Sequence, residues 1–463
     1  MIYRSSLNCE LRIDSEYHKK RFLQDDSSIH KYHTVLIGAI ATVSDGQHGY
    51  HEEDASSPIH MLTAKNTKDW FANLVDTIRI AKWVDDNNKR SSLSVDDIIL
   101  STRGTVGKCA LVKADILPAN LDQDVARISF TNAQIAPAFV LCYLNSIFGQ
   151  DWMVRNQTGM VQQGLSLEKV RQIPIPQMSI TFQDKICEIV ENAFARKKES
   201  VWSYDAANRI LDDMIGIKDL CATTISKKSF FQSFVKTGRL DAEYYQPKYD
   251  ILFDELKKFS CKRLGGPNGI INIKKSIEPG SEAYTEDGIP FVRVSDISKF
   301  GISEPDIKLR SDIIPNPEVL FPPKDTILLS KDGSVGIAYK VEATMPIITS
   351  GALLHLKVRD KTEVLPDYLT LVLNSPVVQL QAERDSNGAI IQHWKPSEIE
   401  NVIIPILDMN TQKEIAAKVQ EAFALRKQSK QLLEYAKQAV EMAIEQGEDV
   451  ALKWLKDKIP VEV

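Results

Sequence analysis

Two stretches of the chain repeat apolar residues at intervals of three and four, which is the spacing of one helix face. The apolar positions between Gln183 and Ile215 are Ile186, Val190, Ala193, Val201, Tyr204, Leu211 and Ile215. Those of the second stretch are Ile415, Val419, Ala422, Leu433, Ala436, Val440 and Ile444. Lys197 and Arg426 interrupt the two stripes at matching positions. The pattern predicts two helices of about 34 residues, roughly 50 Å long, and each stripe needs a partner.

Shorter apolar runs ahead of each long helix predict strands and a further helix. Residues 96–101 (DDIILS) and 325–330 (DTILLS) are typical of buried strands, and a glycine-bearing turn follows each of them. Helices are expected to begin at Pro137 and Pro366, because proline is favoured in the first helical turn. Each half of the chain is therefore expected to mix strands and helices.

An internal repeat relates the two halves. From Asp96 onward, adding 229 to a residue number finds a matching residue without a gap for about 120 positions. Such pairs are Ser101 and Ser330, Gly104 and Gly333, Asn145 and Asn374, and Gln183 and Gln412. Upstream the offset is 227, since RIDSEY (12–17) falls on RLDAEY (239–244). Residues 30–90 and 257–320 show no similarity. We call the matched residues the frame and these two unmatched segments the inserts, so one repeated frame is expected to carry two different inserts.

We predict an α+β protein of two duplicated mixed α/β domains, each followed by a long helix. A single repeat of this length is typical of a duplicated domain, because solenoid repeats have periods of about 20–50 residues. Two-fold pseudo-symmetry favours packing the two helices on each other as an antiparallel coiled coil. The alternative, in which each stripe packs only on its own domain, stays open. The predicted segments are domain 1 (1–180), helix 1 (181–217), a linker (218–238), domain 2 (239–409), helix 2 (410–447) and a C-terminal tail (448–463).

The composition limits which binding partners and which cellular compartment we expect. The 463 residues carry 57 Lys and Arg against 62 Asp and Glu, a formal net charge of −5, so a nucleic-acid surface could only be a local patch. The first twenty residues hold no apolar core of signal-peptide length, and no apolar stretch approaches the roughly 20 residues of a membrane span. The six cysteines are scattered without a CxxC pair. We therefore expect a cytoplasmic protein with reduced thiols.

Motifs of catalysis and cofactor binding do not fit. Residues 102–108 (TRGTVGK) resemble a phosphate-binding loop, but Thr102 replaces the first glycine and Cys109 stands where Ser or Thr would bind magnesium. A tight turn between strands is the better interpretation. The early histidine pairs would need further ligands placed nearby to bind a metal, and neither pair has a counterpart in the second copy. The sequence lacks a glycine-rich turn with a downstream acid, which is the pattern that would indicate a nucleotide or methyl-donor cofactor. We expect a non-catalytic chain with no cofactor and no metal.

The order of the remaining segments resembles the specificity (S) subunit of Type I restriction–modification systems. The resemblance is carried by RLDAEYYQPKYD (239–250), DTILLSKDGSVG (325–336), PDYLTLVLNS (366–375) and NTQKEIAAKVQEAFALRK (410–427), with weaker twins in the first half. The first copy departs from the start of the repeat, since Ser15 and His18 stand where the second copy has Ala242 and Tyr245.

That resemblance implies two target-recognition domains, residues 1–180 and 239–409, held apart by a coiled-coil spacer. It implies double-stranded DNA as a partner, two methyltransferase (M) subunits on the helical region and two restriction (R) subunits in the larger assembly. Because the inserts differ, we expect the two half-sites to differ, which gives an asymmetric bipartite target. The resemblance further implies adenine methylation in each half-site and a role in phage defence.

Candidate DNA contacts are polar or basic side chains on turns, the types that read base edges or anchor phosphates. Those of the first insert are Ser44, Gln47, His48, Lys65 and Asn66. Those of the frame turns and the paired loops are Arg103, Thr105, Lys331, Gln163, Gln392 and His393. Those of the second insert are Lys274, Lys275, Arg293 and Ser295. A solvated loop residue is the competing interpretation for each.

Two other functions stay open. The chain could be a DNA-modifying or DNA-cleaving enzyme with a cryptic catalytic site, which an assay on the isolated chain would reveal. It could also be a coiled-coil scaffold without DNA contact, which would show no salt-dependent DNA binding even with partners present.

Overall fold

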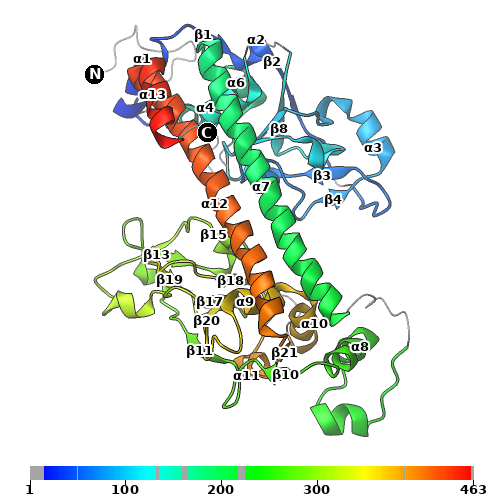
Figure 1. Cartoon of the computed structure of the whole chain (residues 1–463). Helices are drawn as coiled ribbons and strands as arrows, with labels where there is room; N and C mark the ends of the chain where they lie inside the picture. Colours follow the sequence, from blue (N-terminus) through cyan, green and yellow to red (C-terminus); the bar gives the residue numbers. More distant parts are fainter. Residues whose placement is uncertain are drawn as a thin grey trace. The chain divides into compact units, whose positions relative to one another are not determined.

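The computed structural model of the chain describes residues 15–49, 51–131, 135–158, 164–216, 225–386, 388 and 392–459. The chain divides into two compact units. Unit 1 comprises Met1–Lys197 with Lys427–Val463, and unit 2 comprises Lys198–Arg426. Both predicted long helices are present, as α7 (Ile180–Ile215) and α12 (Met409–Gln446) (Figure 1). Each of them contributes one half to each unit.

Unit 1 is a mixed α/β unit built on a four-stranded antiparallel sheet of order β2-β8-β5-β6. A three-stranded sheet, β4-β3-β7, and the pair β1-β9 accompany it. Its strands are β1 (Thr34–Leu36), β2 (Ala41–Asp45), β3 (His60–Leu62), β4 (Ile78–Arg79), β5 (Ile98–Ser101), β6 (Cys109–Leu111), β7 (Ala119–Leu121), β8 (Val125–Phe130) and β9 (Pro174–Pro176). Its other helices are α1 (Lys20–Ile29), α2 (Ile37–Ile40), η2 (Ala64–Thr67), α3 (Lys82–Asn87), η3 (Lys89–Ser91), η4 (Ala114–Ile116), α4 (Pro137–Asn145), α5 (Ile147–Arg155), α6 (Leu167–Arg171) and α13 (Glu448–Lys458).

Unit 2 is built in the same way, on a sheet of order β11-β20-β17-β18 with a second sheet, β12-β16-β13-β19. Its strands are β10 (Cys261–Arg263), β11 (Ile271–Lys275), β12 (Tyr284–Thr285), β13 (Ile289–Val292), β14 (Ile297–Ser298), β15 (Gly301–Ile302), β16 (Lys308–Leu309), β17 (Ile327–Ser330), β18 (Ala338–Lys340), β19 (Ile348–Thr349), β20 (Leu353–Val358) and β21 (Ile403–Pro405). Its other helices are η5 (Phe231–Val235), η6 (Ala242–Tyr245), α8 (Pro247–Leu256), η7 (Ser281–Ala283), η8 (Val294–Asp296), η9 (Pro317–Leu320), α9 (Pro366–Asn374), α10 (Pro376–Asp385) and α11 (Pro396–Glu400).

The two units repeat the same side-chain contacts at positions 229 apart. In unit 1 the Gln150 amide donates to the carbonyl of Leu144 at 2.7 Å. In unit 2 the Gln379 amide donates to the carbonyl of Leu373 at 2.8 Å. These bonds satisfy carbonyls at the end of a helix, which lack partners within the helix itself. These shared residues of the repeat therefore have a structural role, since they stabilise the helix ends of each unit.

The predicted gap-free offset of 229 is wrong across β7–β8 and β19–β20. Ile98 pairs with Ile128 in unit 1, whereas Ile327, 229 residues later, pairs with Leu356, so the offset in this strand is 228. The connection before the strand is one residue shorter in unit 2, and the connection after it is one residue longer. The shortening and the lengthening cancel, so the offset is again 229 after the strand. The one-residue shift is therefore hard to see in the sequence.

The two inserts also share more than their sequences predict. Ser44 of β2 lies opposite Arg127 of β8, and Lys274 of β11 lies opposite His355 of β20. Strands β2 and β11 thus occupy the same place in the two sheets, with an offset of 230. Backbone pairing can persist while the side chains on the strand change, so this likeness leaves no trace in the residue types.

The apolar stripes of the long helices lie in the cores of the units. Buried Val190 of α7 and Val440 of α12 belong to one cluster in unit 1, and buried Leu211 and Val419 belong to one cluster in unit 2. The stripe prediction fails at Val201, which is 40% exposed.

Helix α13 occupies much of the segment that the sequence predicts as a tail. Its Ala451 and Leu455 are buried in the core of unit 1. The Glu448 carboxylate accepts a hydrogen bond from the backbone N–H of Ser179 at 3.0 Å. Among the described residues, no helix is long and apolar enough to cross a bilayer.

Candidate nucleic-acid interface

In each unit the glycine-bearing turn of the frame (102–108 in unit 1, 331–337 in unit 2) packs against a second loop. We call this second loop the paired loop; it contains Leu165 in unit 1 and Trp394 in unit 2. In unit 1 the N–H of Leu165 donates to the carbonyl of Thr102 at 2.9 Å, and in unit 2 the N–H of Trp394 donates to the carbonyl of Lys331 at 2.8 Å. The structure thus brings together the candidates Lys331, Gln392 and His393, whose loop also accepts a hydrogen bond from Gly333. Gln163 lies outside the described residues.

The frame turns are tight hairpin turns, as the sequence predicts. Strand β5 pairs with β6, so the glycine-rich turn joins two strands and not a strand to a phosphate-binding helix. Gly104 and its counterpart Gly333 have φ values of 70° and 73°, a left-handed conformation that favours glycine. Thr105 is exposed beside Gly104, and its carbonyl accepts a hydrogen bond from Ser101.

Each of these junctions places basic side chains beside a carboxylate. In unit 2, Asp332 accepts a hydrogen bond from the Lys331 ammonium and lies 2.8 Å from Nδ1 of His393. Burial alone would raise the pKa of Asp332, but these hydrogen bonds outweigh it, so the pKa lies below its ordinary value. In unit 1, Nη1 of Arg103 lies 3.3 Å from Oδ1 of Asp124. Arg103 and His393 are exposed and could contact phosphate.

The turn of the first insert forms a second polar cluster. Nε2 of His48 lies 2.8 Å from Oδ2 of Asp45, and Nη2 of Arg90 lies 3.1 Å from Oδ1 of the same carboxylate. The Ser44 hydroxyl donates to the carbonyl of Arg90 at 2.6 Å. Sequence reasoning missed Arg90, which is 59% exposed, because it lies more than 40 residues away in the chain.

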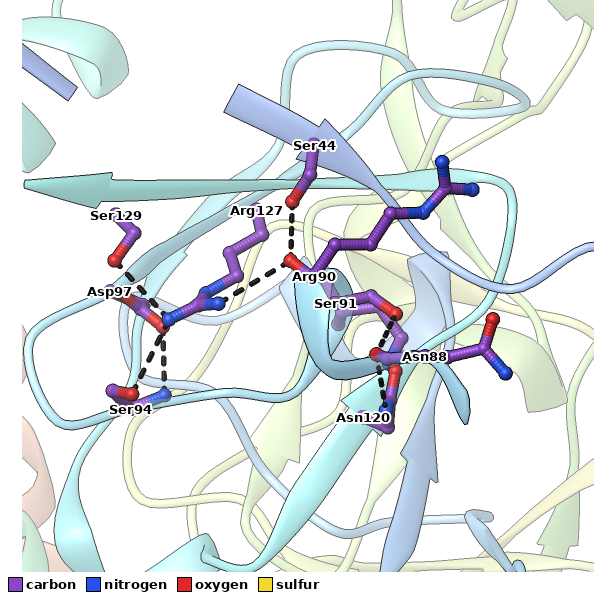
Figure 2. A network of polar contacts seen from close by, with 10 residues as sticks. Ser44, Asn88, Arg90, Ser91, Ser94, Asp97, Asn120, Arg127 and Ser129 are labelled. Atoms are coloured by element: carbon purple, nitrogen blue, oxygen red, sulfur yellow. Dashed lines mark hydrogen bonds and ion pairs between the residues drawn. The ribbon is translucent and has the colours of Figure 1, made fainter. Parts of the chain in front are cut away.

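Arg127 holds this cluster in place from within the sheet (Figure 2). Its Nε donates to Oδ2 of Asp97 at 2.6 Å, and its Nη1 donates to the carbonyl of Arg90 at 3.3 Å. Its Nη2 bonds the hydroxyls of Ser94 and Ser129. The side chains of Arg127 and Asp97 are only 14% and 3% exposed. A nearly buried ion pair with several further hydrogen bonds therefore fixes the surface segment that carries Arg90.

Two candidates of the first insert point into the protein. Gln47 is 3% exposed, and neither polar atom of its side chain has a hydrogen-bond partner among the described residues. Asn66 is 1% exposed, and its side chain accepts from the N–H of Thr63 and donates to the carbonyl of Val75. These contacts cap the η2 turn. Neither side chain is available to DNA in this conformation, whereas Lys65 between them is exposed.

The candidates of the second insert lie at its surface. Lys274 and Lys275 are exposed on β11, and the Lys274 ammonium donates to the carbonyl of Val319 at 2.8 Å. The backbone N–H of Arg293 donates to Oδ2 of Asp296 at 2.8 Å, which caps the η8 turn as Asn66 caps η2. The guanidinium of Arg293 is partly exposed, and Ser295 is exposed beside it.

Behind Lys274, His355 is buried in β20. Its Nε2 lies 2.8 Å from the Thr349 hydroxyl. Burial, and next the positive charge of Lys274, lower the pKa of His355 to about 4. The imidazole is therefore neutral at pH 7.

The second half of the chain matches a known family. Residues 265–435 match the family model described as "Type I restriction modification DNA specificity domain". A curated relative, the Type I restriction enzyme EcoBI specificity subunit of Escherichia coli, is 29% identical over 143 residues. These residues are 31% of this chain and 30% of the relative, so the match spans less than a third of the relative's length. The predicted resemblance to specificity subunits is thus confirmed.

Two solved structures of such subunits align with this chain at low identity and with TM-scores below 0.5. The S subunit of a Type I restriction–modification system from M. genitalium is 13% identical, with 89% of this chain and 95% of that one covered and a TM-score of 0.39. The HsdS subunit from Thermoanaerobacter tengcongensis is 16% identical, with 90% and 97% covered and a TM-score of 0.30.

Proposed function

We propose that this chain is the non-catalytic DNA specificity subunit of a Type I restriction–modification system. It reads an asymmetric, two-part target in double-stranded DNA and positions methyltransferase and restriction subunits on it. The observation that carries the proposal is a repeated frame with unlike side chains at its surface, of which the second copy matches the model of the DNA specificity family. Residues 1–180 and 239–409 are then two target-recognition domains from one duplication.

Unlike side chains at equivalent places support two different half-sites. Ser44 and Lys274 occupy equivalent positions in the sheets of the two units. Thr63 and Arg293 are the N-cap residues of the equivalent turns η2 and η8. A small hydroxyl and a cationic side chain offer different hydrogen-bond patterns to a base edge. Each domain would therefore favour its own short sequence.

The residues that remain on the surface divide into two roles. Those of the shared junctions would anchor phosphates, because both domains need that contact whatever the bases. Those of the inserts would read bases. The proposed anchoring set is Arg103, Thr105, Lys331, Gln392 and His393, and the proposed reading set is Ser44, His48, Lys65, Arg90, Lys274, Lys275, Arg293 and Ser295.

The long helices would serve as an antiparallel coiled-coil spacer. Contacts within each unit support this. In unit 1 the Ser429 hydroxyl donates to the carbonyl of Ala193 at 2.6 Å, and in unit 2 the Ser203 hydroxyl donates to the carbonyl of Lys418 at 2.9 Å. A helix of 36 residues is about 54 Å long, more than one turn of B-DNA. Linking two weak readers raises the effective concentration of the second once the first is bound. Two methyltransferase subunits on this region would each flip out an adenine.

Methylation mapping tests the proposal. The chain is co-expressed with the products of its genomic neighbours, the assembled complex is purified, and adenine methylation of the host DNA is mapped by single-molecule sequencing. We expect an asymmetric motif of two parts with a fixed spacer. An assembled complex that binds the methyl donor but produces no such motif would overturn the proposal.

A single substitution assigns one half-site to one domain. Removing the guanidinium in Arg293→Ala should cost about 1–3 kcal/mol if it reads a base, with relaxed preference at one position of one half-site. Arg310→Ala is the matched control, because Arg310 is half exposed in an ion pair with Asp312. Unchanged affinity and an unchanged motif would remove Arg293 from the reading set.

A further inference from the structure

The structure gives a role to the two cations that interrupt the apolar stripes. In unit 1 the Lys197 ammonium lies 5.3 Å from the ring centroid of Phe71 and 2.8 Å from Oδ2 of Asp69. The Phe71 ring, which is fully buried, packs on Phe194 with centroids 5.0 Å apart. Lys197 and Phe194 belong to α7, whereas Phe71 belongs to the insert. A cation and a ring of the helix thus hold one ring of the insert.

Unit 2 contains a similar arrangement, in which the Lys299 ammonium is a second cation, 5.1 Å from the ring centroid of Phe300. Cζ of Arg426 lies 4.3 Å from the ring centroid of Phe300, which lies 6.4 Å from the centroid of Phe423. Arg426 and Phe423 belong to α12, and Phe300 joins β14 to β15 in the insert. Tyr204 of α7 adds an edge-on contact to Phe300 at 5.0 Å. All three members lie 229 residues after those of unit 1.

Each insert ring closely follows a proposed reading turn. Phe71 comes after the η2 turn that carries Lys65, and its backbone is bridged to Leu111 at the end of β6. Phe300 comes after the η8 turn that carries Ser295, and it closes the β14–β15 hairpin. The position of each reading turn is therefore tied to the position of its ring on the long helix.

A cation at this place has a directional effect that an apolar residue would lack. Burying an ammonium or guanidinium away from water is costly unless it has a partner. Asp69 is one partner of Lys197, and the face of an aromatic ring provides another, but only within about 6 Å of the centroid. Leu or Ala in the stripe would pack against the ring in several positions, whereas the cation favours one.

We propose that the cation clamps Lys197–Phe71 and Arg426–Phe300 are positioning devices that set the spacer length at which the two half-sites are accepted. This inference rests on the proposed function. The clamps hold each reading turn at one place along its helix, and they do not read bases themselves. Weakening either clamp therefore leaves the bases of both half-sites unchanged and widens the range of spacers.

The test uses the co-expressed complex with Arg426→Ala and, separately, Lys197→Ala. Methylation is compared at sites with the cognate spacer and at sites with one base pair more or less. We expect discrimination between spacers to fall about three- to thirtyfold, the ratio that corresponds to a partly desolvated cation–π contact. Arg426→Lys should restore most of it. The matched control is Lys185→Ala, whose ammonium pairs with Glu188 in an ion pair on α7.

A second measurement separates this inference from the proposed function. Hydrogen exchange of the purified complex should show faster exchange in residues 297–302 of Arg426→Ala than in the wild type. A wild-type motif with unchanged spacer discrimination in both variants overturns the inference and leaves the proposed function intact. Absence of any two-part motif in the wild type overturns the proposed function, and unchanged exchange of the hairpin then overturns the clamp as well.

Discussion

One position in the sheets of the two units carries Arg127 in unit 1 and His355 in unit 2. Arg127 lies opposite Ile99 and Ser44, and His355 lies opposite Leu328 and Lys274. The backbone pairing is the same, yet the buried side chain is a charged guanidinium in one unit and a neutral imidazole in the other.

The two side chains organise their surroundings differently. A buried guanidinium requires a carboxylate and further acceptors, so Arg127 gathers Asp97 and the carbonyl of Arg90 around it. The imidazole of His355 needs only one partner, Thr349, and Lys274 remains on the surface. The comparison teaches that an unchanged backbone register can present two unlike surfaces, because the central side chain decides which loop is held.

The largest expected effect comes from removing the charge in unit 1. Arg127→Ala leaves Asp97 buried without its cation, and breaking a buried pair in this way costs about 3–5 kcal/mol of unfolding free energy. Urea unfolding of the purified chain measures the loss, with Arg310→Ala as the exposed control. A loss below about 1 kcal/mol would mean that the network does not hold unit 1 together.

His355 should make the stability of unit 2 depend on pH. Its pKa is about 4 in the folded chain and 6.5 ordinarily, so between these values the unfolded chain binds a proton that the folded chain does not. Stability should therefore fall by about 2–3 kcal/mol as the pH drops from 7 to 4. The difference in urea midpoints between the wild type and His355→Gln isolates this contribution. Equal pH dependence of the two chains contradicts the assignment.

The two turn caps should respond unequally to the exchange of an amide and a carboxylate. Asn66→Asp loses the donor to the Val75 carbonyl and places a carboxylate beside it, at a cost of about 1–3 kcal/mol. Asp296→Asn keeps an acceptor for the N–H of Arg293 and should cost less than about 1 kcal/mol. Thermal unfolding of the two variants, run in parallel, decides between this order and its reverse.

The smallest expected effect lies at the rim of the unit 1 network. Ser44→Ala removes one partly exposed hydrogen bond to the carbonyl of Arg90, worth about 0.5–1 kcal/mol. Hydrogen exchange in residues 89–94 should rise slightly while β5 stays protected. A loss of stability as large as that of Arg127→Ala would place Ser44 at the centre of the network.

Long-period patterns were readable from the sequence, and individual side-chain directions were not. The stripes predicted α7 and α12 because helical periodicity is a property of residue spacing alone. Gln47 and Asn66 were proposed as DNA contacts because polar residues in turns have the same composition whether they face water or cap a buried turn. The exposed Arg90 was missed because its partner Asp45 is brought near only by folding.

The sequence by itself determined the two-part frame, its long helices and its resemblance to specificity subunits, since these depend on the order and spacing of residues along one chain. Only the tertiary structure decided the shift of one residue at β8, the shared strands of the inserts and the rings that Lys197 and Arg426 contact. The physical reason is that such features join segments far apart in the chain. A pairing of that kind depends on backbone register and burial, which residue types alone do not encode.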